Sequence, residues 1–374
     1  MKIAVNTRVL LSSRMEGVCR YIHETLKQMV LDHPEDEFFF FFDRPYDEQF
    51  IYGPNVTPVV INPPARHPIL HYIWFEIALP RALKKHNIDV FYSGDTYLSL
   101  STHVPTVLVC HDIAYAHYPE HIPWLTRKYY QYFFPRFHQR ADKILAVSHA
   151  TKNDIVSEYK LDADKVVVAY NSVKEGMQPL GLSDREVVKD KYTAGKDYFI
   201  YVGAVHPRKN VVSIIKAFDE FKKQTQSDMK LVLVARVAWN AEEFLDTLAT
   251  AKYKQDIIHL NEIYNEEVNA LTASALAMVY VSFFEGFGLP ILEAMHCDVP
   301  VICSGVSSMP EVAGDAAILV DPYSIESIKE AMLSMYNDGD LRKALIEKAR
   351  IQRQKFDWSC TADITYKAII KLKK

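Results

Sequence analysis

The sequence predicts an α/β protein with two domains, each built on a doubly wound parallel sheet. Short apolar runs rich in valine, isoleucine and aromatic residues alternate with longer segments of helical periodicity, which is typical of parallel strands connected by helices. The alternation begins at 2–6, stops after 171 and begins again at 198–202. A chain of 374 residues is long enough for two domains of ordinary size.

We expect the first domain over 1–172, and after it a linker over 173–197 that is charged and lacks a steady periodicity. Five consecutive phenylalanines at 38–42 predict a strand buried on both faces. Helices are predicted at 18–31 and at 70–86, the second one kinked at Pro80. The strands expected in this domain are 2–6, 37–43, 59–61, 89–92, 104–110, 144–148 and 166–169.

The second domain is expected over 198–355, followed by a final helix within 356–374. Amphipathic periodicity predicts helices at 325–337 and 341–353. The strands expected in this domain are 198–202, 230–234, 257–260, 277–282 and 299–303.

The composition argues against several classes of protein. A net charge of −4 gives no general attraction to nucleic acid, and no apolar run approaches the roughly 20 residues of a membrane span. The five cysteines are dispersed without C-x-x-C spacing, which favours reduced thiols and a cytoplasmic location. We expect neither a metal nor another cofactor.

A loop with two glycines, at 283–289, carries the strongest local signal. It follows the expected strand 277–282 and contains Gly286 and Gly288, and Pro290 fits the first position of the short helix that comes next. In such strand–loop–helix units the ligand binds at the carboxyl end of the strand, where amide groups of the helix N-terminus attract anions or hydroxyls.

Two carboxylates lie in this unit. Glu285 is in the loop, and Glu293 is eight residues further on, inside the helix. A catalytic carboxyl pair would need a separation of about 5–10 Å, which this spacing does not determine. We favour two separate tasks, one at the reacting group and one at another part of a long ligand. The alternative is that Glu285 caps the helix and Glu293 faces solvent.

Arg208 and Lys209 directly precede a predicted helix, after the strand 198–202 and a turn at Gly203. Cations are unfavourable at a helix N-terminus, so helix stability does not explain why two cations are placed there. Together with the helix dipole they would form a pocket for a diphosphate. The alternative is a solvated, charged loop.

Gly17 and His111 are weaker candidates in the first domain. Gly17 is the single glycine of the first strand–helix turn, which is more often ordinary turn geometry than a phosphate site. His111 follows the run 104–110, at the carboxyl end of an expected strand. We favour a functional role for His111 and interpret Asp112 as a structural or orienting partner.

The segment 123–143 interleaves aromatic and basic side chains. Such a segment can lie on an anionic membrane surface, so a weak peripheral membrane contact remains open. We favour a helix wedged between the sheet and its neighbours, with its basic ends in water.

The run FFEGFGLPILEAM, followed by VPVICSGVSSMPEVAGDAAILVDP, resembles the signature of family-4 retaining glycosyltransferases of the GT-B fold, and the similarity extends over nearly the whole chain. The E-x7-E pattern of that family falls on Glu285 and Glu293. The resemblance implies two Rossmann-like domains facing each other across a cleft, with the helix at 356–374 crossing back to the first domain. The chain departs from its relatives in having Gly17 alone where they carry two or more glycines.

The resemblance implies transfer of a mannose- or glucose-like hexose from GDP-mannose or a UDP-hexose to a hydroxyl of a glycan or lipid-linked glycan. We expect this transfer to need no metal, because Arg208, Lys209 and the helix dipole can neutralise a leaving diphosphate and we recognise no Asp-x-Asp metal motif. Glu285 and His111 would act at the reacting sugar, and main chain at Glu262 and Ile263 would border the base. The donor-binding residues it implies are Arg208, Lys209, Glu293, Phe287, Gly288, Leu289 and Gly17.

Two other functions remain open at this level. One is a sugar-nucleotide sensor without catalysis, and the other is an epimerase or phosphorylase on the same fold. A dinucleotide dehydrogenase is disfavoured because no G-x-G-x-x-G follows the first strand. The sequence does not identify the donor, the acceptor or the oligomeric state.

Overall fold

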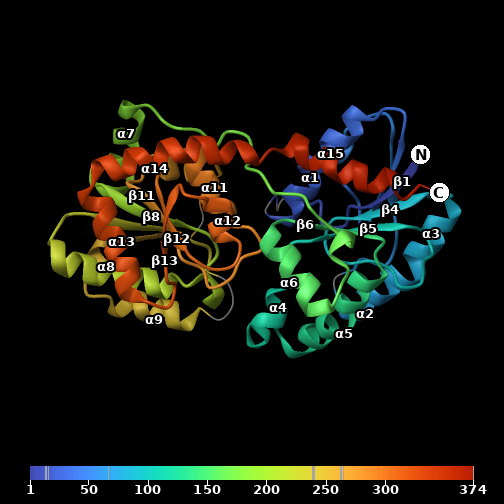
Figure 1. Ribbon diagram of the computed structural model, residues 1–374, viewed down its shortest axis with the longest axis horizontal. Coiled ribbons are helices and arrows are strands. Elements are labelled where there is room, and N and C mark those ends of the chain that lie inside the picture. The colour runs from blue at the N-terminus through green and yellow to red at the C-terminus, as the bar shows by residue number, and fades with distance from the viewer. Residues whose placement is uncertain are drawn as a thin grey trace. The chain divides into compact units, whose positions relative to one another are not determined.

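The computed structural model describes residues 1–12, 15, 17–65, 67–237, 241–261, 263 and 265–373. The chain forms two compact units (Figure 1). Unit 1 consists of Met1–Ser172 together with Phe356–Lys374, and unit 2 consists of Val173–Lys355.

Unit 1 is built on a parallel sheet whose described strands number seven, in the order β3-β2-β1-β4-β5-β6-β7. The strands are β1 (Lys2–Asn6), β2 (Glu37–Phe42), β3 (Val56–Val60), β4 (Val90–Ser93), β5 (Thr106–Cys110), β6 (Lys143–Ala146) and β7 (Val166–Val168). The helices that pack on this sheet are α1 (Val18–Asp32), α2 (Pro68–Ile73), α3 (Leu79–Lys85), α4 (Ala114–His117), α5 (Trp124–Arg140), α6 (His149–Tyr159) and α15 (Trp358–Ile370). Every strand expected in the first domain is present, with ends shifted by a few residues.

The phenylalanine strand β2 is buried on both faces, as predicted. It lies between β1 and β3, and none of its phenylalanines is more than 7% exposed. Phe39 and Phe41 belong to the core cluster that holds Trp74. Phe40 points to the other face, where its ring contacts that of Tyr52.

The helix predicted at 70–86 is three consecutive pieces. A π-helical turn, Trp74–Ala78, separates α2 from α3. Pro80 lies in the first turn of α3, where its missing N–H removes no helical hydrogen bond within that helix. The irregular turn therefore begins ahead of Pro80, because the proline ring clashes with the carbonyl of the preceding turn.

The C-terminal helix α15 packs against α1 inside unit 1, which confirms the expectation that the chain returns to its first domain (Figure 1). The hydroxyl of Tyr366 donates a hydrogen bond to Asp36 Oδ2 at 2.6 Å. The ring of Tyr366 stacks on His33. These contacts join segments that are distant in sequence.

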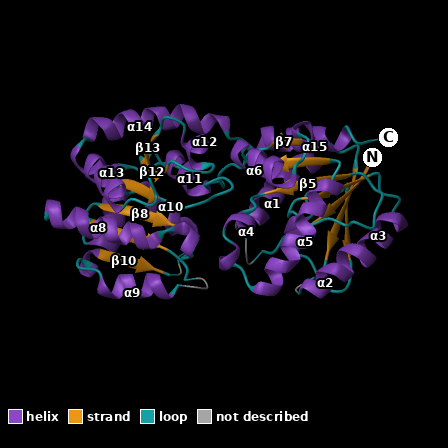
Figure 2. Ribbon diagram, turned by 60° about the horizontal axis from the view of Figure 1, so that its bottom comes forward, coloured by secondary structure: helices purple, strands orange, loops and turns teal. Residues whose placement is uncertain are grey.

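Unit 2 is built on a parallel sheet whose described strands number six, in the order β10-β9-β8-β11-β12-β13. Helices cover both faces of each sheet (Figure 2). The strands are β8 (Tyr198–Val202), β9 (Lys230–Val234), β10 (Ile257–Leu260), β11 (Ala277–Tyr280), β12 (Val301–Ser304) and β13 (Ala317–Val320). The helices are α7 (Leu182–Thr193), α8 (Val211–Thr225), α9 (Glu242–Thr250), α10 (Asn265–Ala273), α11 (Leu289–His296), α12 (Met309–Ala313), α13 (Ile325–Asn337) and α14 (Gly339–Gln352).

The segment 173–197 differs from the irregular linker that we expected. It contains α7, which packs against α10 and groups with unit 2. Few of its side chains are buried, so the apolar periodicity that reveals a helix in a sequence is weak there.

Each sheet has one point at which the strand order reverses. In unit 1 this point lies between β1 and β4, and in unit 2 between β8 and β11. Loops that leave the carboxyl ends of these neighbouring strands run to opposite faces of the sheet, which opens a binding position between them.

Candidate active site

The glycine loop of unit 2 connects β11 to α11, as predicted, although β11 ends two residues earlier than expected. Gly288 precedes α11 with a φ of 107°, a conformation that other residues rarely adopt. A Cβ at this position would lie 3.2 Å from Ile291 Cδ1. Pro290 occupies the first turn of α11, and the first amides of any helix have no intrahelical acceptor.

Two serines hold this loop, and the sequence analysis did not identify them. Ser308 Oγ donates to the carbonyl oxygens of Phe287 at 2.7 Å and Glu285 at 2.9 Å. Ser307 Oγ donates to the same Glu285 carbonyl at 2.6 Å. Both serines follow β12, the neighbour of β11, so their place after the next strand was the available signal.

The Glu285 carboxylate is the centre of a buried cluster. Its Oε1 accepts from Lys209 Nζ at 2.6 Å and from the Tyr280 hydroxyl at 2.9 Å, and its Oε2 accepts from Arg208 Nη1 at 3.1 Å. Lys209 also donates to the Tyr280 hydroxyl at 2.9 Å, and Arg208 donates to the carbonyl of Phe284. Glu285 is only 7% exposed.

The electrostatics of this cluster keep Glu285 ionised. Burial by itself raises the pKa of a carboxyl, but the charges of Lys209 and Arg208 outweigh burial and lower the pKa of Glu285 to about 2. One carboxylate and two cations leave a net charge of +1. A buried site with excess positive charge beside helix amides is suited to an anion.

The two cations are placed by a single turn after β8. Pro207–Lys209 form a short 3₁₀ turn, and Asn210 then adopts the left-handed conformation with a φ of 58°. The Asn210 amide donates to the carbonyls of Val281 at 3.0 Å and Pro322 at 2.8 Å. Arg208 and Lys209 therefore precede α8 as predicted, and their contact with Glu285 joins β8 to β11 at the reversal of strand order.

Glu293 lies inside α11 and is half-buried. Burial raises the pKa of the Cys297 thiol, and the charge of Glu293, one turn earlier in the chain, raises it further. The polar contacts of Glu285 come from the turn after β8, from β11 and from the residues after β12. Separate tasks for the two carboxylates stay a prediction.

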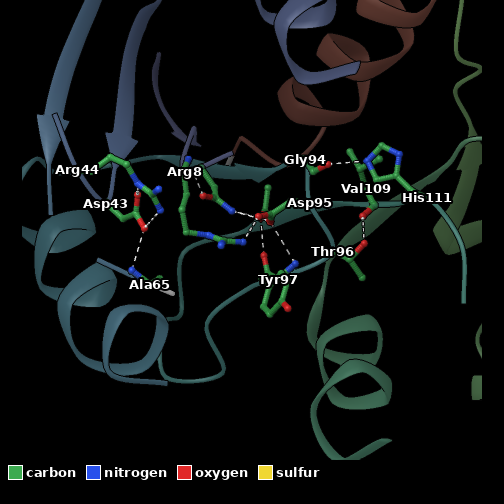
Figure 3. Close-up of polar contacts among 12 residues, drawn as sticks. Arg8, Asp43, Arg44, Ala65, Gly94, Asp95, Thr96, Tyr97, Val109 and His111 are labelled. Atoms are coloured by element: carbon green, nitrogen blue, oxygen red, sulfur yellow. Dashed lines mark hydrogen bonds and ion pairs between the residues drawn. The ribbon is translucent and has the colours of Figure 1, made fainter. Parts of the chain in front are cut away.

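His111 belongs to unit 1 and follows β5. Its Nε2–H donates to the carbonyl of Gly94 at 2.8 Å (Figure 3). Its ring meets the ring of Tyr21 edge-on, with the ring centres 5.2 Å apart. Burial lowers the pKa of His111, although the Gly94 contact opposes this. The imidazole is therefore neutral near pH 7 and carries its proton on Nε2. Asp112 accepts from Ala114 N at 2.9 Å at the start of α4, a structural role.

Gly17 caps α1 with a φ of 45°, and no atom lies within 4 Å of the position of a Cβ. This conformation is a sufficient local reason for glycine, and contact with a phosphate stays a prediction. The residue Glu262, expected beside the base, lies outside the described residues, whereas Ile263 follows β10 and is half-buried.

Two Asp-x-Asp triplets occur in the chain, at 162–164 and 338–340. Asp162 accepts from Asp164 N at 2.9 Å and Asp338 accepts from Leu341 N at 2.8 Å, so both triplets are helix caps. Among the described residues, no three or more histidine, cysteine or carboxylate side chains form a metal-binding group.

The aromatic and basic segment forms α5, whose two faces differ. Phe134, Phe137 and His138 are buried against the core, as we favoured. Elsewhere on this helix, Trp124 is 64% exposed and Tyr132 is 54% exposed. Within the described parts of the chain, no helix combines the length and hydrophobicity needed to cross a membrane.

Solved structures place this architecture among the GT-B glycosyltransferases. WaaG, a glycosyltransferase involved in lipopolysaccharide biosynthesis, matches with a TM-score of 0.75 at 16% identity, covering 98% of this chain and 99% of WaaG. HepE from Anabaena, in complex with UDP-glucose, matches with a TM-score of 0.74 at 17% identity, covering 99% of this chain and 100% of HepE. The chain has the same fold of two α/β units.

The chain belongs to glycosyltransferase family 4 and is a glycosyltransferase. Residues 184–352 match the family described as glycosyl transferases group 1, and residues 15–175 match the one described as glycosyltransferase family 4. O-antigen chain mannosyltransferase B from Escherichia coli is 30% identical over 275 residues, 73% of this chain and 72% of the relative. O-antigen chain mannosyltransferase RfbU from Salmonella typhimurium is 28% identical over 285 residues, 75% of this chain and 74% of the relative.

Proposed function

We propose that the protein transfers a hexose from a nucleoside-diphosphate sugar to a hydroxyl of a glycan or lipid-linked glycan, with retention and without a metal. The main support for this proposal is the Glu285 cluster, in which Arg208 and Lys209 lie at the reversal of strand order of unit 2. Relatives named mannosyltransferases favour mannose as the sugar. The HepE complex with UDP-glucose keeps a UDP-hexose as the alternative donor.

In this proposal the donor diphosphate replaces Glu285 as the hydrogen-bond acceptor of the two cations. Arg208 and Lys209 transfer hydrogen bonds from Glu285 to phosphate oxygens and neutralise the charge that develops on the leaving group. Glu285 then accepts hydrogen bonds from sugar hydroxyls, and the amides of Phe287, Gly288 and Leu289 bind the same ring. Tyr280 remains beneath Glu285 and orients it.

The other residues have supporting roles in the proposal. Glu293 accepts hydrogen bonds from the ribose hydroxyls, and Gly17 allows close approach of main chain to the diphosphate. His111 accepts a hydrogen bond from a donor-sugar hydroxyl at Nδ1, which carries no proton because the Nε2–H donates to the carbonyl of Gly94.

The chemical step exchanges one bond at the anomeric carbon for another. The bond between this carbon and the phosphate oxygen breaks, and a bond to the acceptor oxygen forms on the same face of the sugar. The acceptor proton moves to the leaving phosphate oxygen. A covalent glycosyl-enzyme adduct trapped on this chain would contradict this route.

The first test is the thermal stabilisation of the purified protein by GDP, UDP, GDP-mannose and UDP-glucose in the presence of EDTA. A ligand that binds the folded state raises its stability by mass action. We expect one base to give a shift that is lost in Arg208→Ala and kept in Lys223→Ala, which removes an exposed cation of α8. If none of the four ligands at millimolar concentration raises the melting temperature, the proposal is contradicted. If a ligand raises the melting temperature but no sugar is transferred, a sensor is favoured.

We also propose that the exposed face of α5 makes a weak contact with an anionic membrane. The helix carries four arginines and lysines and no acidic residue. Trp124 and Tyr132 are suited to the headgroup region of a bilayer. Co-sedimentation with phosphatidylglycerol vesicles at low salt should fall in a Trp124→Ala, Tyr132→Ala double variant and not in Leu182→Ala, which lies in unit 2. Equal sedimentation of all three proteins would contradict this contact.

A further inference from the structure

The reversal of strand order in unit 1 carries a buried polar cluster of its own (Figure 3). Asn6 ends β1 and Ser93 ends β4, and Asn6 Nδ2 donates to Asp95 Oδ1 at 2.7 Å and to Ser93 Oγ at 3.0 Å. Arg8 donates to Asp95 Oδ2. The side chains of Arg8 and Asp95 are 10% and 4% exposed, so both charges are almost wholly buried at the edge where ligands of such sheets bind.

The hydrogen bonding of this cluster is incomplete. Asp95 Oδ1 accepts from Asn6, Ser93 and the Tyr97 amide, but Oδ2 accepts from Arg8 alone among the described residues. Arg8 Nε is buried and has no acceptor in the part of the chain that the structure describes. A buried donor without a partner lowers the stability of the folded state, so folding stability gives no reason for this arrangement.

A second ion pair at this edge of the sheet, between Asp43 and Arg44, provides a comparison. Arg44 binds Asp43 through two nitrogens, at 2.6 and 2.7 Å, and Asp43 Oδ2 also accepts from Ala65 N at 2.8 Å (Figure 3). Asp43 and Arg44 are adjacent residues after β2, and no buried donor of Arg44 lacks an acceptor among the described residues. The unused donor of Arg8 therefore distinguishes its pair from an ordinary structural ion pair.

The surroundings of Arg8 are aromatic and have no net charge. Its guanidinium lies 5.1 Å from the ring centre of Tyr97, and the ring of His71 stacks on Tyr97 at 5.0 Å. Burial and the charge of Arg8 lower the pKa of His71 to about 4, so His71 is neutral near pH 7. Its buried Nδ1 also has no hydrogen-bond partner among the described residues. The charges of the two Arg–Asp pairs cancel, which disfavours a charged ligand.

The backbone after β4 is also strained, at the residue that follows Asp95. Thr96 has a φ of 72°, which is rare for a β-branched residue, and its Oγ1 donates to the carbonyl of Val109 at 3.1 Å. Such strain persists only where the surrounding structure enforces it, and it concentrates at functional positions.

We propose that Arg8 and Asp95 bind one hydroxyl of a neutral sugar ring in the acceptor, and that Tyr97 and His71 pack on the ring. A hydroxyl both donates and accepts, and it is complementary to the unused Arg8 Nε–H and the half-used Asp95 Oδ2. A small turn of the guanidinium, which is one-tenth exposed, gives Nε its missing acceptor while Nη2 stays near Asp95. This inference rests on the proposed function, because that function makes a glycan the acceptor.

The test compares sugar binding by the wild type, Arg8→Lys and Arg44→Lys. Both variants keep the positive charge and remove the planar fork of donors. Saturation-transfer NMR would measure binding of methyl α-mannopyranoside, the corresponding methyl glucuronoside and inorganic phosphate. We expect the neutral mannoside to bind the wild type and Arg44→Lys equally, and to bind Arg8→Lys at least about tenfold more weakly.

Several outcomes would overturn the inference. They are equal mannoside affinity in the wild type and Arg8→Lys, no mannoside binding to the wild type at tens of millimolar, and tighter binding of the glucuronoside or phosphate. Because Arg8→Lys could fail to fold, a second measurement uses the wild type alone. The ring proton resonances of His71 should shift as mannoside is added, and constant resonances would also overturn the inference.

The donor panel separates this inference from the proposed function. A nucleotide shift without mannoside binding refutes the Arg8 site and leaves the transferase proposal in place. A flat nucleotide panel with mannoside binding that depends on Arg8 refutes the donor proposal and leaves a sugar site in unit 1.

Discussion

Replacement of Glu285 by glutamine tests the central ionic cluster most directly. The change keeps the size of the side chain and removes the charge that Lys209 and Arg208 share. The difference between the ordinary pKa of 4.5 and a value of about 2 corresponds to about 3 kcal/mol. Because Glu285 is buried, solvent screening reduces this value little. We expect Glu285→Gln to lower the free energy of unfolding by about this amount at pH 7.

The pH dependence follows from the direction of the pKa shift. The folded value lies below the ordinary one, so the stabilisation by ionised Glu285 is fully present above pH 4.5 and is lost as the pH falls toward 2. Urea denaturation, followed by circular dichroism at several pH values, should show the difference between wild type and Glu285→Gln narrowing below pH 4.5. Lys223→Ala should show no such dependence.

The same variant separates donor binding from transfer. The net charge of the cluster changes from +1 to +2, so binding of the nucleoside diphosphate should stay equal or tighten. Transfer from the sugar nucleotide should fall by roughly 10²-fold, since the carboxylate is needed at the sugar. Unchanged stability at pH 7, together with unchanged transfer, would refute the reasoning about Glu285.

Three further variants test neighbouring features of the site. Glu293→Ala should raise the KM for the donor by about tenfold with little change in kcat, and a loss confined to kcat would contradict a role at the ribose. Ser308→Ala should lower the free energy of unfolding by about 1–2 kcal/mol in urea denaturation, because the carbonyls of Glu285 and Phe287 lose a donor. Gly288→Ala should lower it by a similar amount through the φ of 107°, and equal stability would show that the loop relaxes.

The elements that sequence analysis predicted well are those with strong local signals. The phenylalanine strand β2 and the glycine loop before α11 were both placed correctly. The helix α7 was missed because its side chains are mostly exposed and its periodicity is weak. The break between α2 and α3 was placed at Pro80 rather than at the π-helical turn before it, since a sequence does not reveal how a helix relieves a proline clash.

The site shows the same division. Arg208, Lys209, Glu285 and His111 were all selected from their positions at strand ends and helix starts. Their sequence positions did not indicate that both cations bind Glu285 or that His111 is held by Gly94. Ser308 was not selected because its hydroxyl acts on backbone carbonyls, and its place after β12 was the only signal in the sequence.

The sequence by itself determined the alternation of strands and helices, the glycine loop and the family, because these depend on residue types at short spacing. The tertiary structure decided which charges meet. Lys209 and Glu285 are 76 residues apart, and Arg8 and Asp95 are 87 apart. They meet because β8 pairs with β11 and β1 with β4, and pairing between strands far apart in the chain is set by packing of the whole sheet.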